Sequence, residues 1–256
     1  MLGAIAGDII GSVYEANPVK TMDFELFGES SRFTDDTVLT VATARALLDG
    51  MDYAEAYRTY GRRYPRAGYG EAFINWLMTD DAPPYNSWGN GSAMRVSPVG
   101  YAGETMDFVL GEAAKSAAVT HNHPEGIKGA QAVAAAIFMG RRGQSKEEIR
   151  RFTIEQFAYD LEPTIAQIRP GYFFDVSCQG SVPQAIIAFL ESEDVEDAIR
   201  LAISLGGDGD TQGCIAGAIA YAYYGKMAPE MERQVRRRLP QDFIAILDVF
   251  LELYVS

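Results

Sequence analysis

Two short stretches of the sequence place close pairs of aspartates directly before an apolar run. Asp35 and Asp36 stand in FTDDT, Asp208 and Asp210 stand in GGDGDTQG, and each stretch also contains a threonine. Two unit charges about 4 Å apart repel by roughly 4 kcal/mol at an effective dielectric constant of about 20. If the two stretches meet in the fold, the carboxylates need protons or a cation. Oxygen ligands without thiolate or imidazole favour Mg²⁺, Mn²⁺ or Ca²⁺ over zinc, so the pattern predicts a site for hard cations.

A simpler structural explanation exists for each aspartate taken alone. Asp35 or Asp210 could be an N-cap, accepting hydrogen bonds from the first turn of the helix that follows. The sequence also contains Thr79-Asp80-Asp81, which is followed by Ala-Pro-Pro and is interpreted as a turn. The motif is therefore not diagnostic by itself. The two stretches taken together with Glu15 favour the metal interpretation.

The segment WGNGSAMRVSPVG, residues 88–100, indicates a ligand-binding loop. Exposed backbone N–H groups in a Gly-Asn loop, followed by Ser92 as a predicted helix N-cap, suit a phosphate or pyrophosphate. Trp88 and Tyr85 could stack on a base. The alternatives are an ordinary turn with Arg95 in a surface ion pair, and aromatic side chains that only pack.

His121 and His123 are the only histidines, and they lie in THNHPEG. We interpret this segment as the start of a helix, with His121 reaching towards a ligand phosphate. A metal site at the His-x-His pair is a weaker alternative. Cys178 with His121 as a thiol nucleophile pair has no local signature to support it.

Helical periodicity dominates the elements that must position these residues. We predict helices at 35–50, 126–142, 181–194, 195–207, 210–225 and 232–254. The nearest candidates for strands, FTDD and the segment around Phe173, are short. The sequence therefore predicts an all-α fold, with residues 1–256 forming a single domain.

Two of the expected helices carry stripes of glycine. Gly3, Gly7 and Gly11 repeat every four residues within 3–15, and Gly213 and Gly217 do so within 210–225. Glycine costs up to about 1 kcal/mol per helix position relative to alanine, so close packing of two helices is the expected compensation. Such packing would bring helix ends and polar side chains together. It would also place Asp8 and Glu15 on one helix face.

Composition restricts the function classes. The formal net charge of −13 argues against nucleic acid or an anionic membrane as the main partner. The apolar N-terminus lacks the basic flank of a signal peptide, so we expect none. No uncharged run approaches about 20 apolar residues, so we expect no membrane span. Two cysteines are too few for a disulfide framework, so we expect a cytoplasmic protein.

Together, these segments resemble the ADP-ribosylglycohydrolase family, of the dinitrogenase-reductase-activating glycohydrolase and ADP-ribosyl-acceptor hydrolase type. The resemblance covers nearly the whole chain and is carried, in order, by residues 3–15, 33–37, 89–100, 120–121 and 204–225. It implies a compact, orthogonal multi-helix bundle with a binuclear Mg²⁺ or Mn²⁺ centre.

The resemblance also implies roles for individual residues. The expected metal ligands are Thr34, Asp35, Asp36, Asp208, Asp210 and Thr211. The expected ligand-binding residues are Ser87, Trp88, Gly89, Asn90, Gly91, Ser92 and His121, with Trp88 against adenine. Asp36 or Glu15 is expected to act as general base on a water or as proton donor to the leaving group. Gly209 departs from the threonine or serine of many relatives, which predicts looser surroundings for the metals.

The implied activity is hydrolysis of the bond at the anomeric carbon of ADP-ribose. The partner would be an ADP-ribosylated protein or a small ADP-ribose conjugate, and we expect a monomer. The acceptor stays open among arginine, serine, an acetyl ester, a nucleobase and poly(ADP-ribose). Two other functions remain: a metal-dependent phosphohydrolase acting on a nucleotide pyrophosphate, and a non-enzymatic relative, since the family includes lens structural proteins.

Overall fold

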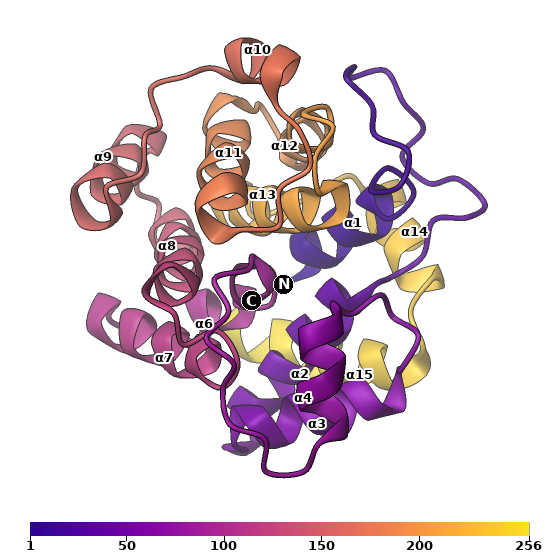
Figure 1. Cartoon of the computed structure of the whole chain (residues 1–256). Helices are drawn as coiled ribbons and strands as arrows, with labels where there is room; N and C mark the ends of the chain where they lie inside the picture. The colour runs from indigo at the N-terminus through magenta and orange to yellow at the C-terminus, as the bar shows by residue number, and fades with distance from the viewer. Residues whose placement is uncertain (256) are drawn as a thin grey trace.

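The computed structural model describes residues 1–255 of the chain, and over these residues the fold is all-α, as predicted (Figure 1). The fifteen α-helices and one 3₁₀ helix are α1 (Leu2–Gly11), α2 (Asp35–Asp49), α3 (Tyr53–Arg63), α4 (Glu71–Met78), α5 (Gly91–Met94), α6 (Ser97–Ala102), α7 (Met106–Ala118), α8 (Pro124–Arg141), α9 (Lys146–Phe157), α10 (Ile165–Ile168), η1 (Arg169–Gly171), α11 (Cys178–Glu191), α12 (Val195–Ile203), α13 (Gly209–Tyr224), α14 (Pro229–Arg237) and α15 (Gln241–Tyr254). Extended pairing within these residues is limited to one isolated bridge between Gly89 and Ser177. Neither FTDD nor the segment around Phe173 forms a strand, in agreement with the all-α prediction.

The packing of α1 against α13 organises the core. These two helices are antiparallel neighbours, because Gly3 meets Gly217 while Gly7 meets Gly213. A Cβ added to Gly7 would lie 1.9 Å from the carbonyl oxygen of Gly213, so the backbones touch directly. The predicted close packing of the glycine stripes is confirmed. As a consequence, the C-terminal end of α1 lies against the N-terminal end of α13.

Helix α2 starts and stops where its sequence predicts. Thr34 is the N-cap and accepts from the backbone N–H of Asp36 at 3.4 Å, and Gly50 ends the helix with a φ of 66°. Glycine adopts this left-handed conformation without the penalty that a Cβ brings. Because Thr34 caps α2 and Asp35 is its first helical residue, the interpretation of Asp35 as N-cap is wrong. Asp210 is likewise no N-cap, since that position in α13 belongs to Asp208.

Other predicted boundaries differ from the structure. The region 232–254 contains two helices, α14 and α15, which separate before Pro240 because proline disfavours helical conformation in the residue before it. Helix α1 ends at Gly11, so Glu15 lies beyond it rather than on its face. Four helices of eight or more residues, α3, α4, α7 and α9, went unpredicted. Helix α9 carries a local signal in its capping box of Ser145 and Glu148.

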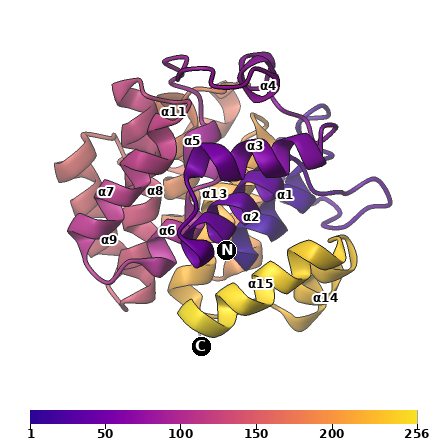
Figure 2. The ribbon, with the colours of Figure 1, turned by 90° about the horizontal axis from the view of Figure 1, so that it is seen from below.

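The helices form three groups around the α1–α13 pair (Figures 1 and 2). Helices α11 and α12 pack on α13, helix α8 packs on α13 and carries α6, α7 and α9, and α2 packs on α1, α3 and α15. In the view of Figure 2, α14 and α15 run along one edge of the molecule. Within residues 1–255, no helix combines the length and the apolar character that crossing a membrane requires.

Candidate metal centre and active site

Three carboxylates gather where α1 ends and α13 begins. One oxygen from each of Glu15, Asp208 and Asp210 lies within 4.8 Å of the others. Asp208 and Asp210 are 5 % exposed, whereas Glu15 is exposed on the loop after α1. The side chain of Asp208 does not cap its own helix and instead accepts from Asn90 Nδ2 at 2.7 Å.

The second aspartate pair approaches from α2. Thr211 Oγ1 donates to Asp36 Oδ1 at 3.4 Å, which joins two stretches 175 residues apart. Asp36 Oδ2 is buried and has no hydrogen-bond partner. Asp35, whose backbone N–H donates to Ala67, lines the same cavity. The two acidic stretches therefore converge on one site.

Asp8 holds the start of α2 in place, a role that the sequence analysis missed. This wholly buried carboxylate of α1 accepts from Thr34 N–H at 2.9 Å, from Thr34 Oγ1 at 2.6 Å and from Thr37 N–H at 3.1 Å. It also accepts from the Thr37 hydroxyl. The sequence did indicate this role, because Asp8 is the one charged residue of an otherwise apolar helix. A carboxylate buried in such a place requires several hydrogen-bond donors.

Burial and mutual repulsion dominate the electrostatics of the cluster. Burial, and then the charge of Asp8, raises the pKa of Asp35 to about 8. The pKa of Asp36 lies well above its ordinary value for the same two reasons, and burial with Asp36 does the same to the pKa of Asp210. Burial and Asp208 raise the pKa of Glu15. Without a cation, these groups retain protons that ordinary carboxyls lose.

The donor set fits hard divalent cations. All the converging atoms are oxygens of carboxylates and hydroxyls, which Mg²⁺ and Mn²⁺ prefer. Asp36 Oδ2 is an orphaned buried acceptor, and an unpaired polar atom in such a position normally costs about 1–3 kcal/mol. A cation would satisfy this oxygen and relieve the repulsion among the carboxylates.

This electrostatic arrangement predicts how metal-free protein responds to pH. Asp35 keeps its proton up to about pH 8 when folded but loses it near its ordinary value of 3.8 when unfolded. Unfolding therefore releases protons, and stability falls as pH rises towards 8, by up to about 1.4 kcal/mol per pH unit for each such group. We expect the melting temperature in chelator to fall from about pH 6.5 to 8.5. The stabilisation by Mn²⁺ or Mg²⁺ should grow over the same range. A metal effect that shrinks with rising pH would contradict this.

The carboxylates form one wall of a cavity of about 420 Å³. Ser87, Gly89, Asn90, Gly91 and His121 line the same cavity. Asn90 connects this loop to the carboxylates, because its side-chain amide donates to Asp208, and a second bond to Ser181 at 3.1 Å holds it in place. The predicted loop and the predicted metal ligands therefore line one cavity.

Two of the predicted ligand-binding residues lie elsewhere. Trp88 is 52 % exposed and packs edge-on against His123 with ring centroids 5.6 Å apart, and Tyr85 lines the cavity in its place. Ser92 is wholly buried and donates to the carbonyl of Gly126 at 2.7 Å. Ser92 is also not the N-cap of α5, because that position is held by Asn90.

The cavity lining contains three arginines, of which the sequence analysis missed two and misplaced the third. Arg32 and Arg66 are exposed residues of the lining, and no local motif marks them. Arg95 is wholly buried, so its interpretation as part of a surface ion pair is wrong. Its place beside an apolar helical turn, MRVSPV, gave the only hint of burial.

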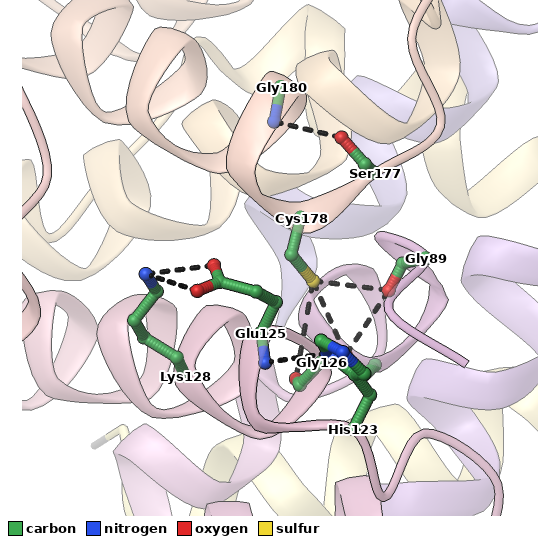
Figure 3. A network of polar contacts seen from close by, with 9 residues as sticks. Gly89, His123, Glu125, Gly126, Lys128, Ser177, Cys178 and Gly180 are labelled. Carbon is green, nitrogen blue, oxygen red and sulfur yellow. Dashed lines mark hydrogen bonds and ion pairs between the residues drawn. The ribbon is translucent and has the colours of Figure 1, made fainter. Parts of the chain in front are cut away.

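A second polar network supports the loop from behind (Figure 3). Cys178 Sγ donates to the Gly89 carbonyl at 3.1 Å, and His123 caps α8 by accepting from the N–H of Glu125. Burial raises the pKa of the Cys178 thiol to about 12. The thiol is thus bonded to the loop and kept neutral, and the pairing of Cys178 with His121 as a nucleophile finds no support in these contacts. The interpretation of THNHPEG as a helix start is confirmed.

Comparisons with known proteins identify relatives in sequence and in structure. The chain resembles ADP-ribosylhydrolase ARH3 of Homo sapiens, with 27 % identity covering 91 % of this chain and 87 % of the relative. It also resembles the ADP-ribosyl-[dinitrogen reductase] glycohydrolase of Rhodospirillum rubrum, with 25 % identity covering 81 % of this chain and 78 % of that protein. A solved structure described as an ADP-ribosylglycohydrolase-related protein complex superimposes with a TM-score of 0.73 at 27 % identity, covering 99 % of this chain and 96 % of that one.

An all-α fold with these relatives defines the protein as an enzyme of the hydrolase class. The sequence profile of the ADP-ribosylglycohydrolase family matches residues 1–254. The chain belongs to the ADP-ribosylglycohydrolase family.

Proposed function

We propose that the protein hydrolyses the bond at the anomeric carbon of ADP-ribose attached to a protein side chain or a small acceptor, releasing ADP-ribose. One observation carries the proposal: a single cavity joins a carboxylate cluster to a glycine-rich loop and a histidine. The loop and His121 would bind the anionic diphosphate, and the carboxylate wall would face the proximal ribose. The names of the relatives support the reaction class.

We propose that two divalent cations, Mg²⁺ or Mn²⁺, are held by Thr34, Asp35, Asp36, Asp208, Asp210 and Thr211. When bound, such ions would polarise the ribose hydroxyls and a water molecule. Two further residues of the chain would hold the proposed metal ligands in position. Asp8 would keep the first turn of α2 in position, and Asn90 would orient Asp208.

We assign the proton transfer to Glu15 rather than Asp36. Asp36 Oδ2 is enclosed, whereas Glu15 lies on an exposed loop that can reach a substrate. Burial and Asp208 raise the pKa of Glu15, which moves it towards the range in which a carboxyl can exchange protons near neutral pH. The general acid or base would thus be the carboxylate at the edge of the cluster.

Replacing Glu15 by glutamine should lower kcat about 10²-fold while leaving KM nearly unchanged. The amide keeps the size of the side chain but cannot transfer a proton. The kcat–pH profile of the variant should also lose the limb that Glu15 contributes. Steady-state kinetics of the wild-type and E15Q proteins between about pH 5.5 and 9 test this expectation. An unchanged kcat would assign the proton transfer to another group.

A panel of defined ADP-ribose linkages tests the proposed activity. Arginine, serine, acetyl-ester, nucleobase and poly(ADP-ribose) conjugates are incubated with Mg²⁺, Mn²⁺ or a chelator, and the products are separated. Release of intact ADP-ribose in the presence of metal supports the proposal and identifies the acceptor. Release of AMP would instead indicate a phosphohydrolase. No product from any linkage would contradict both activities and favour a non-enzymatic relative.

A further inference from the structure

Arg95 is a buried cation without a carboxylate partner. Its side chain is 0 % exposed, and no ion pair involves it among residues 1–255. The guanidinium carbon lies 4.1 Å from the ring centroid of Tyr57. Its NH2 group donates to the carbonyl of Ser116 at 3.0 Å and to Thr120 Oγ1 at 2.8 Å. Burying a charge without an ionic partner is costly, so the residue is expected to serve a purpose beyond packing.

Thr120 connects this cation to His121. The hydroxyl oxygen of Thr120 is 2.8 Å from Arg95 and 2.8 Å from His121 Nδ1. A guanidinium can only donate, so Thr120 accepts from Arg95. Thr120 keeps its own hydroxyl hydrogen, and it can donate this hydrogen to Nδ1 when Nδ1 carries the lone pair.

The charge of Arg95 favours the same arrangement. A neutral imidazole has a lone pair on one nitrogen and a proton on the other. With a fixed positive charge on the Thr120 side, the lone pair is more stable on Nδ1, which leaves the proton on Nε2. Burial, and then the charge of Arg95, lowers the pKa of His121 well below its ordinary value, so the ring stays neutral. Tyr85, with ring centroids 5.8 Å apart, is the other titratable group packed on the imidazole.

The Nε2 atom faces the loop of the cavity. A Cβ added to Gly91 would lie 3.1 Å from Nε2, and one added to Gly89 would lie 3.5 Å from it. His121 is part of the cavity lining, and within residues 1–255 no side chain or carbonyl accepts from Nε2. The proton on Nε2 is therefore available to a ligand. The absence of a Cβ at both glycines keeps this approach open.

We propose that Arg95 and Thr120 are positioning residues that hold His121 as a neutral imidazole with its proton on Nε2, aimed into the cavity as a donor to an anionic ligand oxygen. The identity of that oxygen as part of a diphosphate rests on the proposed function, whereas the proton position does not. Because the imidazole stays neutral, the strength of its hydrogen bond to an anion does not change with pH. The contribution of His121 to ligand binding should therefore be insensitive to pH through the usual histidine range, about pH 6–7.

NMR of the ligand-free protein labelled with ¹⁵N-histidine tests the proton position directly. The chain has only two histidines, and His123→Gln assigns the signals. His123 is an internal reference, because its Nδ1 accepts from the N–H of Glu125 at 3.1 Å. We expect His121 to show protonated Nε2 and unprotonated Nδ1, and to remain neutral below about pH 6.5. A proton on Nδ1, or an imidazolium at neutral pH, would overturn the proposal.

Two matched variants test the role of Thr120. Thr120→Val removes the hydroxyl at nearly constant shape and should yield a mixture of His121 tautomers, whereas Thr120→Ser should keep the wild-type spectrum. For a substrate that the linkage panel identifies, Thr120→Val should raise KM about 10-fold with little change in kcat, and Thr120→Ser should not. An unchanged His121 spectrum in Thr120→Val would overturn the inference. The expected spectra in a protein that turns over no conjugate would contradict the proposed function alone.

Discussion

Replacing Asp36 by asparagine will lower kcat/KM for an ADP-ribose conjugate by at least about 10³-fold if Asp36 is a metal ligand as proposed, because the loss of such a ligand removes several kcal/mol of stabilisation. Asparagine preserves the size of the side chain but has no charge. Asp36 Oδ2 is buried without a partner, and the position would then carry an amide that binds divalent cations weakly. Calorimetric titration with Mn²⁺ should show a matching loss of affinity.

The sequence provides a matched control for this substitution. Asp81 ends the second Thr-Asp-Asp, is exposed, and has a φ of 56° that asparagine also tolerates. Asp81→Asn should leave both Mn²⁺ affinity and turnover unchanged. Wild-type Mn²⁺ affinity in Asp36→Asn would show that this carboxylate is not a ligand. A lowered melting temperature with retained affinity would assign Asp36 a structural role instead.

Replacing Gly7 by alanine will destabilise the protein by at least about 3 kcal/mol, near the upper end of the usual cost of overpacking. The new Cβ would lie 1.9 Å from the carbonyl oxygen of Gly213, and neither backbone can move without separating α1 from α13. These two helices place Glu15 beside Asp208, so turnover should fall along with stability. Urea unfolding followed by circular dichroism measures the change.

Gly111→Ala is the control for the glycine substitution. Gly111 is an exposed residue within α7, and a Cβ added there meets nothing within 4 Å. Alanine should stabilise this helix by about 0.5–1 kcal/mol. Equal unfolding free energies for Gly7→Ala and the wild-type protein would show that the α1–α13 contact is looser than the structure indicates.

The sequence alone determined the features that depend on neighbouring residues. The end of α2 at Gly50 follows from glycine's freedom to adopt a positive φ, and its start from the polar run before an apolar helix. The spacing of Gly3 and Gly7 likewise predicted a flat helix face, because residues four apart lie on one side. Such signals act over one or two helical turns, so they can be recognised without knowing which other segment packs on the helix.

Only the tertiary structure decided features that require two distant segments. Glu15 joins the cluster from a loop, because α1 ends at Gly11 before it could place Glu15 on its own face. Asp8 supports α2 from another helix, and burial of Arg95 depends on the Tyr57 ring and on Thr120. Burial and hydrogen bonding are properties of the space between segments. Residue type and spacing specify which groups can do chemistry, but packing specifies which of them face the cavity.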